Sequence, residues 1–324
     1  MTETHAMADG RRPAPGQAVA PSRRRQRVRV GGVLPYLAIA PALITFALLL
    51  GYPVLLVVET SLQHMGLREL INGGTTWVGL QNFQSILRDP EFAATVVRTF
   101  LFMAANVCLT IALGTLAALL LERLGRRVRL LLSGAMILAW ATPALTGSVI
   151  FQWLFDSKLG VVNWAISSLG IFGDWLNHSW FDTGISTFAI ITVLIVWQGI
   201  PFVAFSLYAG ILSISAELPE AARVDGASER QIFRYVTLPA IRPLLMVLTF
   251  LSIIWDFKVF TQVWTMAQGG PDGATVTLSI YAYITGLSRS QFGIAAAISV
   301  VMVMLLLLVL IPYLNRMLRS EADL

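Results

Sequence analysis

Long apolar stretches alternate with shorter polar ones along this chain, from about residue 34 onward. An apolar helix of about 20 residues crosses the hydrocarbon core of a bilayer, so each stretch of that length predicts one membrane span. We predict six spans, with approximate bounds Leu34 to Leu62, Ala93 to Leu121, Leu130 to Leu154, Gly184 to Leu212, Ala240 to Val263 and Phe292 to Leu318. The pattern therefore predicts an all-α membrane protein.

Composition supports a membrane setting. Hydrophobic residues make up 56% of the chain, charged residues 13%, and the mean hydropathy of +0.72 is far from that of a soluble domain. Residues 1–30 differ, because they are rich in Pro, Ala, Gly and Arg without apolar periodicity, and we predict a disordered basic tail there. The first apolar stretch is too long for the core of a cleavable signal peptide. Residues 31–324 are predicted to form one transmembrane domain.

The distribution of lysine and arginine orients the spans, since short basic loops remain on the cytoplasmic side. Most of the 23 lysines and arginines fall before span one, after spans two and six, and between spans four and five, and the residues left on the outer side are Arg68, Arg88, Arg98, Lys158, Lys258 and Arg289. We therefore predict a multi-pass protein of the cell membrane with both termini cytoplasmic. This topology accounts for the net charge of +5, so the basic tail is not interpreted as a nucleic-acid binding site.

The outer loops contain aromatic side chains. Residues 77–83 predict a turn that leads into a short interfacial helix, and the loop of residues 155–182 contains Trp164, Trp175 and Trp180 together with three aspartates. Two interpretations of these tryptophans stay open: anchors in the membrane interface, or a docking surface for an extracytoplasmic protein.

No motif in the chain indicates catalysis. The lysines, Lys158 and Lys258, are not preceded by a glycine-rich phosphate loop, so the chain is not expected to hydrolyse ATP by itself. His5, His64 and His178 lie in separate segments without a catalytic or metal-binding spacing. The single cysteine, Cys108, allows neither an intrachain disulfide nor a site of several thiolates.

The polar segment between spans four and five has the pattern of a helix, a turn and a second helix. Glu217 to Gly226 favours a helix that ends at Gly226, and Ser228 to Val236 favours a second helix with Gln231 at the capping-box position. Small alanines in the first helix allow another surface to approach closely, and the carboxylate of Glu220 can accept two hydrogen bonds from an arginine. The segment is therefore predicted to dock on a partner beneath the membrane.

Polar side chains inside the spans mark a candidate substrate path. Gln198 and Phe202 lie one turn apart in span four, and Ser252, Trp255 and Asp256 share one face of span five. A buried carboxylate accepts hydrogen bonds from hydroxyl groups in two directions, and an aromatic side chain offers a flat apolar face, so this combination suits a polyol or sugar.

Three other polar residues near these spans need separate interpretations. Asn106 and Gln152 could be either ligand contacts or hydrogen-bonding links between helices. Lys258 is two residues from Asp256 and therefore faces away from it on a helix, so it is expected to extend outward.

The motifs of the polar segment resemble a known family. Their order and spacing match the EAA loop of the membrane subunits of ABC importers, and they consist of Glu220-Ala221-Ala222, Asp225-Gly226-Ala227, Phe233 and Leu238-Pro239. Further runs resemble the carbohydrate branch, the maltose-type and glycerol-3-phosphate-type permeases, namely Tyr52-Pro53, Gly79 to Phe83, Trp197 to Pro201 and Gln268-Gly269-Gly270-Pro271. The Gly-Gly-Pro run is typical of the first of two permeases. The chain lacks the additional spans and large outer domain of the first maltose permease and resembles the six-span majority.

This resemblance implies a type I importer fold with a coupling loop at about residues 213–239, and it implies partners. They are a second permease, a dimer of ATPase subunits that binds ATP and Mg, and an extracytoplasmic solute-binding protein. In this family Glu220 would pair with an arginine in a groove of the ATPase subunit. The chain itself would bind no cofactor and catalyse no reaction.

The resemblance also implies substrate contacts at Gln198, Gly199, Phe202, Ser252 and Asp256, to which the bottom-up pattern adds Trp255. A di- or oligosaccharide or a glycoside is the expected cargo. Glycerol-3-phosphate or another polyol is the alternative within the same class, although Asp256 disfavours an anion. A free-standing secondary transporter is a third hypothesis, but it commonly shows internal repeats, and none is visible here.

Overall fold

The computed structural model describes residues 34–170 and 173–322. The chain divides into two compact units, residues 1–52 and 53–324. The described part of the first unit consists of α1 (Leu34–Phe46) and a π-helical turn (Ala47–Gly51), and Tyr52 begins α2 (Tyr52–Ser61). The predicted disordered tail, residues 1–30, lies outside the described residues.

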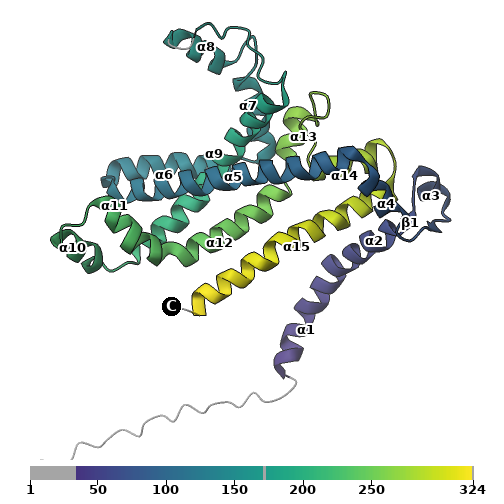
Figure 1. Ribbon diagram of the computed structural model, residues 1–324, viewed down its shortest axis with the longest axis horizontal. Coiled ribbons are helices and arrows are strands. Elements are labelled where there is room, and N and C mark those ends of the chain that lie inside the picture. Colours follow the sequence, from purple (N-terminus) through teal and green to yellow (C-terminus); the bar gives the residue numbers. More distant parts are fainter. Residues whose placement is uncertain (1–33, 171–172, 323–324) are drawn as a thin grey trace, which may run out of the picture. The chain divides into compact units, whose positions relative to one another are not determined.

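The second unit contains the remaining elements (Figure 1). Its helices are α3 (Leu67–Asn72), α4 (Gln81–Arg88), α5 (Pro90–Arg123), α6 (Arg126–Ala141), α7 (Ala144–Leu154), α8 (Val161–Leu169), α9 (Gly184–Leu212), α10 (Glu217–Val224), α11 (Glu229–Ile232), α12 (Leu238–Phe257), α13 (Thr261–Ala267), α14 (Leu278–Tyr283) and α15 (Phe292–Ala322). Two further π-helical turns, Phe233–Thr237 and Ile284–Ser288, precede α12 and follow α14.

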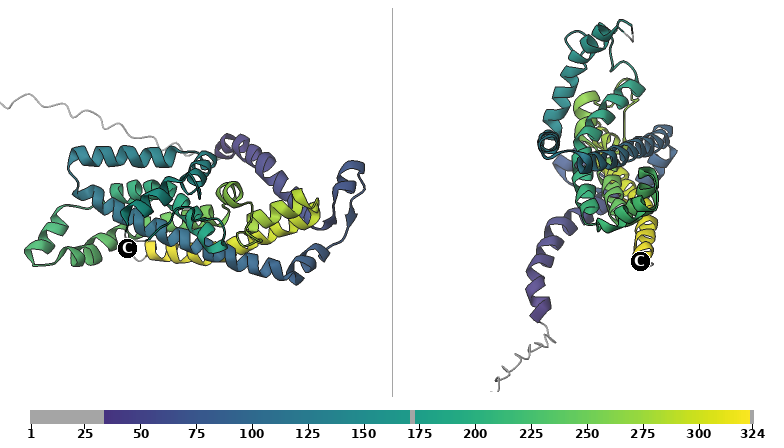
Figure 2. Two further views of the ribbon diagram at one scale, coloured as in Figure 1. Left: turned by 90° about the horizontal axis from the view of Figure 1, so that it is seen from above. Right: turned by 90° about the vertical axis from the view of Figure 1, so that its left-hand side faces the viewer.

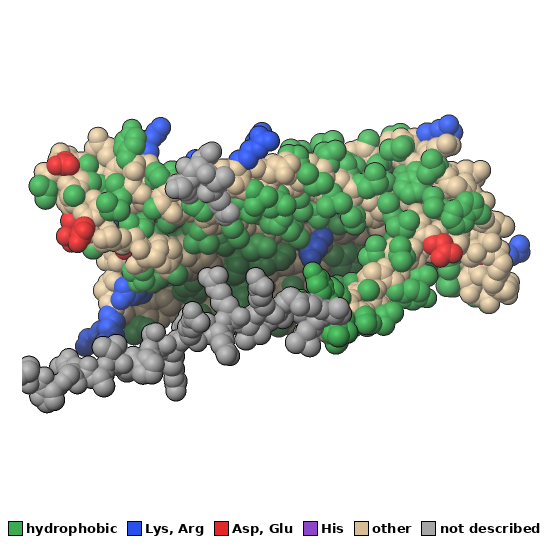
Figure 3. All heavy atoms as spheres, turned by 90° about the horizontal axis from the view of Figure 1, so that it is seen from below, with side chains coloured by type: hydrophobic (Ala, Val, Ile, Leu, Met, Phe, Trp, Pro, Cys, Tyr) green, Lys and Arg blue, Asp and Glu red, His purple; other side chains and the backbone are tan. Residues whose placement is uncertain are grey.

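The described residues include five helices long and apolar enough to cross a membrane, and a sixth span if the bent pair α6 and α7 is counted as one. The two members of this pair meet at 104° between Ala141 and Ala144, where Pro143 interrupts the helix. The all-α fold is confirmed, and the six predicted spans correspond to these five helices together with the bent pair. Large apolar side chains on these helices face outward, as expected for lipid contact, and Figure 3 shows hydrophobic side chains over much of one face.

The fifth span differs from the prediction at both ends. The second loop helix predicted over Ser228 to Val236 is confirmed, with Ser228 and Gln231 in a capping box, but it runs without interruption through the π-helical turn into span five, which therefore extends from Glu229 to Phe257. The span was predicted to end at Val263, but α12 ends at Phe257 and the chain breaks before α13. Hydrophobicity alone does not reveal a break inside an apolar run.

Close packing of α5 against α9 forms the centre of the second unit. A Cβ placed on Gly114 would lie 2.5 Å from Cγ1 of Val203, and one placed on Gly199 would lie 2.9 Å from Cγ2 of Thr110. These two glycines therefore let the helix backbones approach more closely than any larger residue would.

Gly114→Ala is expected to destabilise the fold by about 1–3 kcal/mol, because the new methyl group meets a β-branched side chain with little freedom to move. Gly134→Ala on α6 is the matched control, since nothing lies within 4 Å of its Cβ position. Thermal unfolding in one detergent measures both variants. Equal midpoints for the two would contradict the close approach at Gly114.

Short elements connect the first outer loop to the long helices. Strands β1 (Gln63–His64) and β2 (Thr76–Trp77) pair antiparallel, with Gln63 opposite Trp77. The side-chain amide of Asn82 on α4 donates to the carbonyls of Ser61 and Gln63, at 2.8 and 2.9 Å. The helix predicted after the run of residues 77–83 is thus confirmed as α4, and Asn82 fixes it to the end of α2.

Candidate functional site

The predicted docking helix is present as α10, which stands at one end of the bundle beyond α9 and α12 (Figures 1 and 2). It ends where the sequence predicted, because Gly226 has φ +83° and adopts the left-handed conformation that glycine allows. The N–H of Ala227 donates to Ala222 O, and the N–H of Gly226 donates to Arg223 O. This pair of bonds is a Schellman motif, so Gly226 and the alanines at 222 and 227 together define the end of α10.

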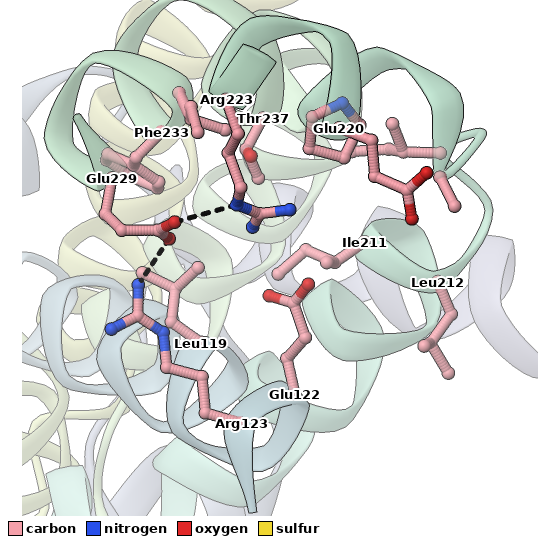
Figure 4. Close-up of a pocket in the computed structure, with 14 residues that line it drawn as sticks. Leu119, Glu122, Arg123, Ile211, Leu212, Glu220, Arg223, Glu229, Phe233 and Thr237 are labelled. Carbon is pink, nitrogen blue, oxygen red and sulfur yellow. Dashed lines mark hydrogen bonds and ion pairs between the residues drawn. The ribbon is translucent and has the colours of Figure 1, made fainter. Parts of the chain in front are cut away.

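A cavity of about 570 Å³ separates α10 from the ends of α5 and α9 (Figure 4). Its lining residues are Leu119, Glu122, Arg123, Ile211, Leu212, Ile214, Ala216, Pro219, Glu220, Arg223, Glu229, Ile232, Phe233 and Thr237. Glu220 lies on the opposite side of this cavity from Glu229, and among the described residues its carboxylate makes no hydrogen bond or ion pair. The residue predicted to bind a partner arginine is therefore accessible, and it is unpaired in the part of the chain that the structure describes.

The carboxylate of Glu229 joins α10 to the end of α5. Its Oε1 accepts from Nε of Arg223 at 3.0 Å, and its Oε2 accepts from Arg123 at 3.1 Å (Figure 4). The hydrogen bond from Arg223 to Glu229 raises the pKa of the Arg223 guanidinium, with smaller contributions from the charges of Glu122 and Glu220. No residue of α10 is buried, so these ion pairs are a principal lateral link between α10 and α5.

If the chain couples transport to ATP hydrolysis as its loop motifs predict, Glu229→Gln is expected to reduce transport without abolishing it, because the bridge between α10 and α5 is weakened while Glu220 remains. The measurement is the amount of substrate carried per ATP hydrolysed in proteoliposomes. Arg230→Gln is the control, since Arg230 is an exposed neighbour without an ion pair among the described residues. If both variants lowered the ratio equally, the bridge would have no specific role.

The remaining residues of the predicted coupling motif lie at or near helix ends or on the surface of α10. Ala221 is exposed on α10, and Asp225, also exposed, is the cap residue that follows the C-terminal end of this helix. Leu238 and Pro239 form the first turn of α12, directly after the π-helical turn, with Leu238 partly buried and Pro239 exposed. Proline is tolerated there because the N–H of a first helical turn is not needed for intrahelical bonding.

A second cavity, of about 440 Å³, lies where two spans are broken; we call it the central cavity. Five of the six predicted substrate residues line it, and the full lining is Trp140, Thr142, Ala144, Ile195, Gln198, Gly199, Phe202, Trp255, Asp256, Lys258, Val259, Phe260, Thr261 and Gln262. The sixth, Ser252, lines an adjoining cavity of about 30 Å³ that shares Gly199, Phe202, Trp255 and Asp256. The structure therefore brings all six predicted residues together.

Asp256 is the buried charge of this region. It is 8% exposed, and among the described residues its carboxylate accepts no hydrogen bond. Phe202 and Trp255 make an edge-to-face contact with ring centroids 5.2 Å apart, and Trp255 remains 46% exposed. A carboxylate beside an accessible aromatic face is an arrangement suited to a sugar.

The side-chain amide of Gln198 already makes two hydrogen bonds within the protein. Its Nε2 donates to the carbonyl of Thr142 at 3.0 Å, and its Oε1 accepts from Gln262 at 3.4 Å. The carbonyl of Thr142 lies at the bend between α6 and α7, where Pro143 has no N–H to offer. Gln198 therefore stabilises the bend as well as lining the central cavity.

Sequence reasoning missed the part of the lining that follows the two breaks, including Trp140, Thr142 and Gln262. Pro143 lies inside the predicted third span, and a proline in an apolar span is a signal that the backbone near it can line a cavity. Lys258 was predicted to extend outward. It is exposed and has no ion pair with Asp256 among the described residues, but it also lines the central cavity.

The structure distinguishes the two interpretations left open for Asn106 and Gln152. Gln152 on α7 donates to the carbonyls of Thr265 and Met266 at 2.9 and 3.2 Å, so it links α7 to α13. Asn106 donates to Phe102 O of its own helix, and its Oδ1 has no partner among the described residues. Gln152 is therefore a link between helices, whereas Asn106 is not.

Two of the three tryptophans of the second outer loop form a cluster with His178. Trp175 and Trp180 stack with ring centroids 5.3 Å apart, and His178 contacts both rings. The amide of Asn163 on α8 accepts from Trp180 Nε1 and donates to His178 O, so it fixes the loop around α8. Trp164 on α8 is 63% exposed, and both interpretations of its role stay open.

Comparison with known proteins decides the family. Residues 110–320 match the family described as the binding-protein-dependent transport system inner membrane component. The chain belongs to this family. The match includes α10, the central cavity and most of the spans, so the resemblance drawn from the loop motifs is confirmed.

Two curated relatives in this family are similar over most of their length. The diacetylchitobiose uptake system permease protein DasB of Streptomyces coelicolor is 42% identical over 312 residues, which cover 96% of this chain and 95% of DasB. The trehalose/maltose transport system permease protein MalF of Thermococcus litoralis is 34% identical over 241 residues, covering 74% of this chain and 79% of MalF. Both names refer to sugars, in agreement with the predicted carbohydrate branch.

Solved structures confirm the fold of this family member. A chain of a bacterial ABC transporter involved in the import of the acidic polysaccharide alginate superposes with a TM-score of 0.75 at 20% identity, covering 88% of this chain and 95% of that chain. A chain of a bacterial alginate ABC transporter in complex with an alginate pentasaccharide-bound periplasmic protein gives a TM-score of 0.73 at 20% identity, covering 86% of this chain and 92% of that chain. At this identity the likeness establishes the fold only.

Proposed function

We propose that this chain is one permease subunit of an ATP-driven ABC importer for a sugar. With a second permease it forms the translocation path, and an extracytoplasmic binding protein delivers the cargo to it. A separate ATPase dimer binds ATP and Mg and hydrolyses the nucleotide. Both termini of this chain are cytoplasmic, and the chain is not an enzyme by itself.

The observation that carries this proposal is the pairing of two sites in one chain. The central cavity presents a buried, unpaired carboxylate beside an accessible aromatic face, and α10 presents an unpaired Glu220 at one end of the bundle. The first site suits a hydroxyl-rich solute, and the second suits a guanidinium of a partner. A closed ATPase dimer offers two docking grooves, whereas this chain has one α10, so a second permease is needed.

The free energy of ATP binding to the ATPase dimer moves the spans through α10. When the ATPase dimer closes on ATP, a partner arginine paired with Glu220 moves α10, and α10 moves α9, which precedes it in the chain, and α12, which follows it. The ion pairs of Glu229 add α5 to this set. Rotation of these helices would open the central cavity alternately to the two sides of the membrane.

Diacetylchitobiose, the sugar in the name of DasB, is the first cargo to test, followed by maltose and trehalose. A second candidate is glycerol-3-phosphate or another polyol. Lys258 in the lining favours an anion, but it is exposed, whereas the opposing carboxylate of Asp256 is almost fully buried. The buried group has the larger electrostatic influence, so a neutral sugar is favoured.

The test begins with affinity purification of this chain from its native membrane in mild detergent and identification of the proteins that accompany it. An ATPase with a phosphate-binding loop, together with a second permease, is the expected result. Reconstitution with the cognate binding protein then measures uptake of the three disaccharides and of glycerol-3-phosphate. Repeated recovery of the chain alone in several detergents, with uptake that needs no ATP, would favour a secondary transporter instead.

A further inference from the structure

The 30 Å³ cavity beside the central cavity is lined by three polar side chains that are almost completely buried. Thr110 on α5 and Ser252 on α12 are each 5% exposed, and Asp256 is 8% exposed. Among the described residues, none of the three side chains makes a hydrogen bond. Buried polar groups are nearly always paired, so three unpaired groups around one cavity indicate a ligand.

The two hydroxyl groups differ from other hydroxyls in these helices. Thr115 on α5 donates to Ile111 O, and Thr249 on α12 donates to Leu245 O, each four residues earlier in its own helix. Thr110 and Ser252 make no such bond, although both lie within helices. Their hydroxyl groups are therefore available to whatever occupies the small cavity.

The size of the cavity limits the ligand. A water molecule needs roughly 10–15 Å³ of space for its centre and typically makes about three hydrogen bonds, so about 30 Å³ accommodates one water but no sugar ring. Among the described residues, no three His, Cys, Asp or Glu side chains come together, so this lining lacks the donor set of a divalent metal site. One water can accept from Thr110 and Ser252 and donate to the carboxylate.

We propose that the small cavity binds one water molecule, and that Thr110 is a positioning residue that acts through this water on Asp256. Gly199 closes the cavity on the side of α9, because its missing side chain lets α9 approach Thr110. With one carboxylate oxygen held by the water, the other is oriented toward the central cavity, where it accepts from a sugar hydroxyl. This inference rests on the proposed function, since it assigns Asp256 to the sugar.

The test compares Thr110→Val with Thr110→Ser in the reconstituted importer. The cargo is whichever of diacetylchitobiose, maltose and trehalose is transported fastest. Valine has the shape of threonine without the hydroxyl group, so the maximal rate of transport should fall about fivefold, the effect of one lost hydrogen bond. The concentration of sugar-loaded binding protein that gives half the maximal rate should stay the same, because docking does not involve Thr110. Thr110→Ser should restore the rate.

Thr115→Val is the matched control, as it removes a hydroxyl from the same helix that bonds only to its own backbone. A high-resolution map of the assembled importer should show density within hydrogen-bonding distance of Thr110 and Asp256, and this density should be lost in Thr110→Val. A wild-type rate in Thr110→Val, an equal loss in Thr115→Val, or no such density would each overturn the proposal. Asp256→Asn distinguishes failure of the proposed sugar site from failure of the proposed water. Normal transport by Asp256→Asn would contradict the sugar site. Reduced transport by Asp256→Asn together with normal transport by Thr110→Val would contradict only the water.

Discussion

Glu220→Ala is expected to lower transport at least about tenfold, because a charge-assisted pair between the carboxylate and a partner arginine loses one member and leaves the other buried in the interface. The chain should still insert, since Glu220 is exposed and makes no hydrogen bond or ion pair through its side chain among the described residues. ATP hydrolysis by the ATPase subunits should continue, uncoupled from sugar uptake. Uptake and hydrolysis measured in the same proteoliposomes test this expectation.

Two further variants give this experiment its controls. Glu217→Ala removes a carboxylate from the same turn of α10 that does not line the cavity, so it should transport normally. Gly226→Pro should reproduce the uncoupling by another route, because proline cannot adopt φ +83° and lacks the N–H that bonds to Arg223 O. Normal transport by both Glu220→Ala and Gly226→Pro would remove the assignment of α10 as the coupling helix.

The coupling segment was predictable from sequence because its signals are local. The glycine at 226, the alanines beside it and the Gln231 of the capping box act through backbone geometry within a few residues, and the structure contains the corresponding bonds from Ser228 to Gln231. The link from Glu229 to Arg123 was not predictable, since it joins residues 106 positions apart on helices whose relative placement depends on tertiary packing. Local patterns fix helix ends, whereas long-range ion pairs require the fold.

The central cavity was predictable in part for a similar reason. Helical periodicity put Ser252 and Asp256 on one face of α12, and the polar residues of α9 marked the facing helix. The breaks after Ala141 and Phe257 bring Trp140 and Gln262 to the same cavity. The position of Trp140 depends on the 104° bend between α6 and α7, which the sequence does not reveal. A hydrophobic run predicts that a segment crosses the membrane, but not where its backbone turns aside.

Asp256→Asn is expected to weaken transport about 10- to 100-fold, the effect of losing a hydrogen bond to a charged acceptor, worth about 1.5–3 kcal/mol. Asparagine has the same shape and preserves the packing around α12, so assembly with the ATPase should be unchanged. Its amide can still accept one hydrogen bond from a sugar hydroxyl, but without the charge and without the second equivalent oxygen. Initial rates of sugar uptake at saturating binding protein are the measurement.

Asp272→Asn is the matched control for this substitution, because Asp272 lies in the outer loop between α13 and α14 and does not line the central cavity. Its transport should equal that of the wild type. The size of the effect at Asp256 also discriminates between cargoes: removing a carboxylate should impair a neutral sugar but improve uptake of an anion, which the carboxylate repels. Faster uptake of glycerol-3-phosphate by Asp256→Asn, with no loss for any disaccharide, would therefore reassign the cavity to an anionic cargo bound through Lys258.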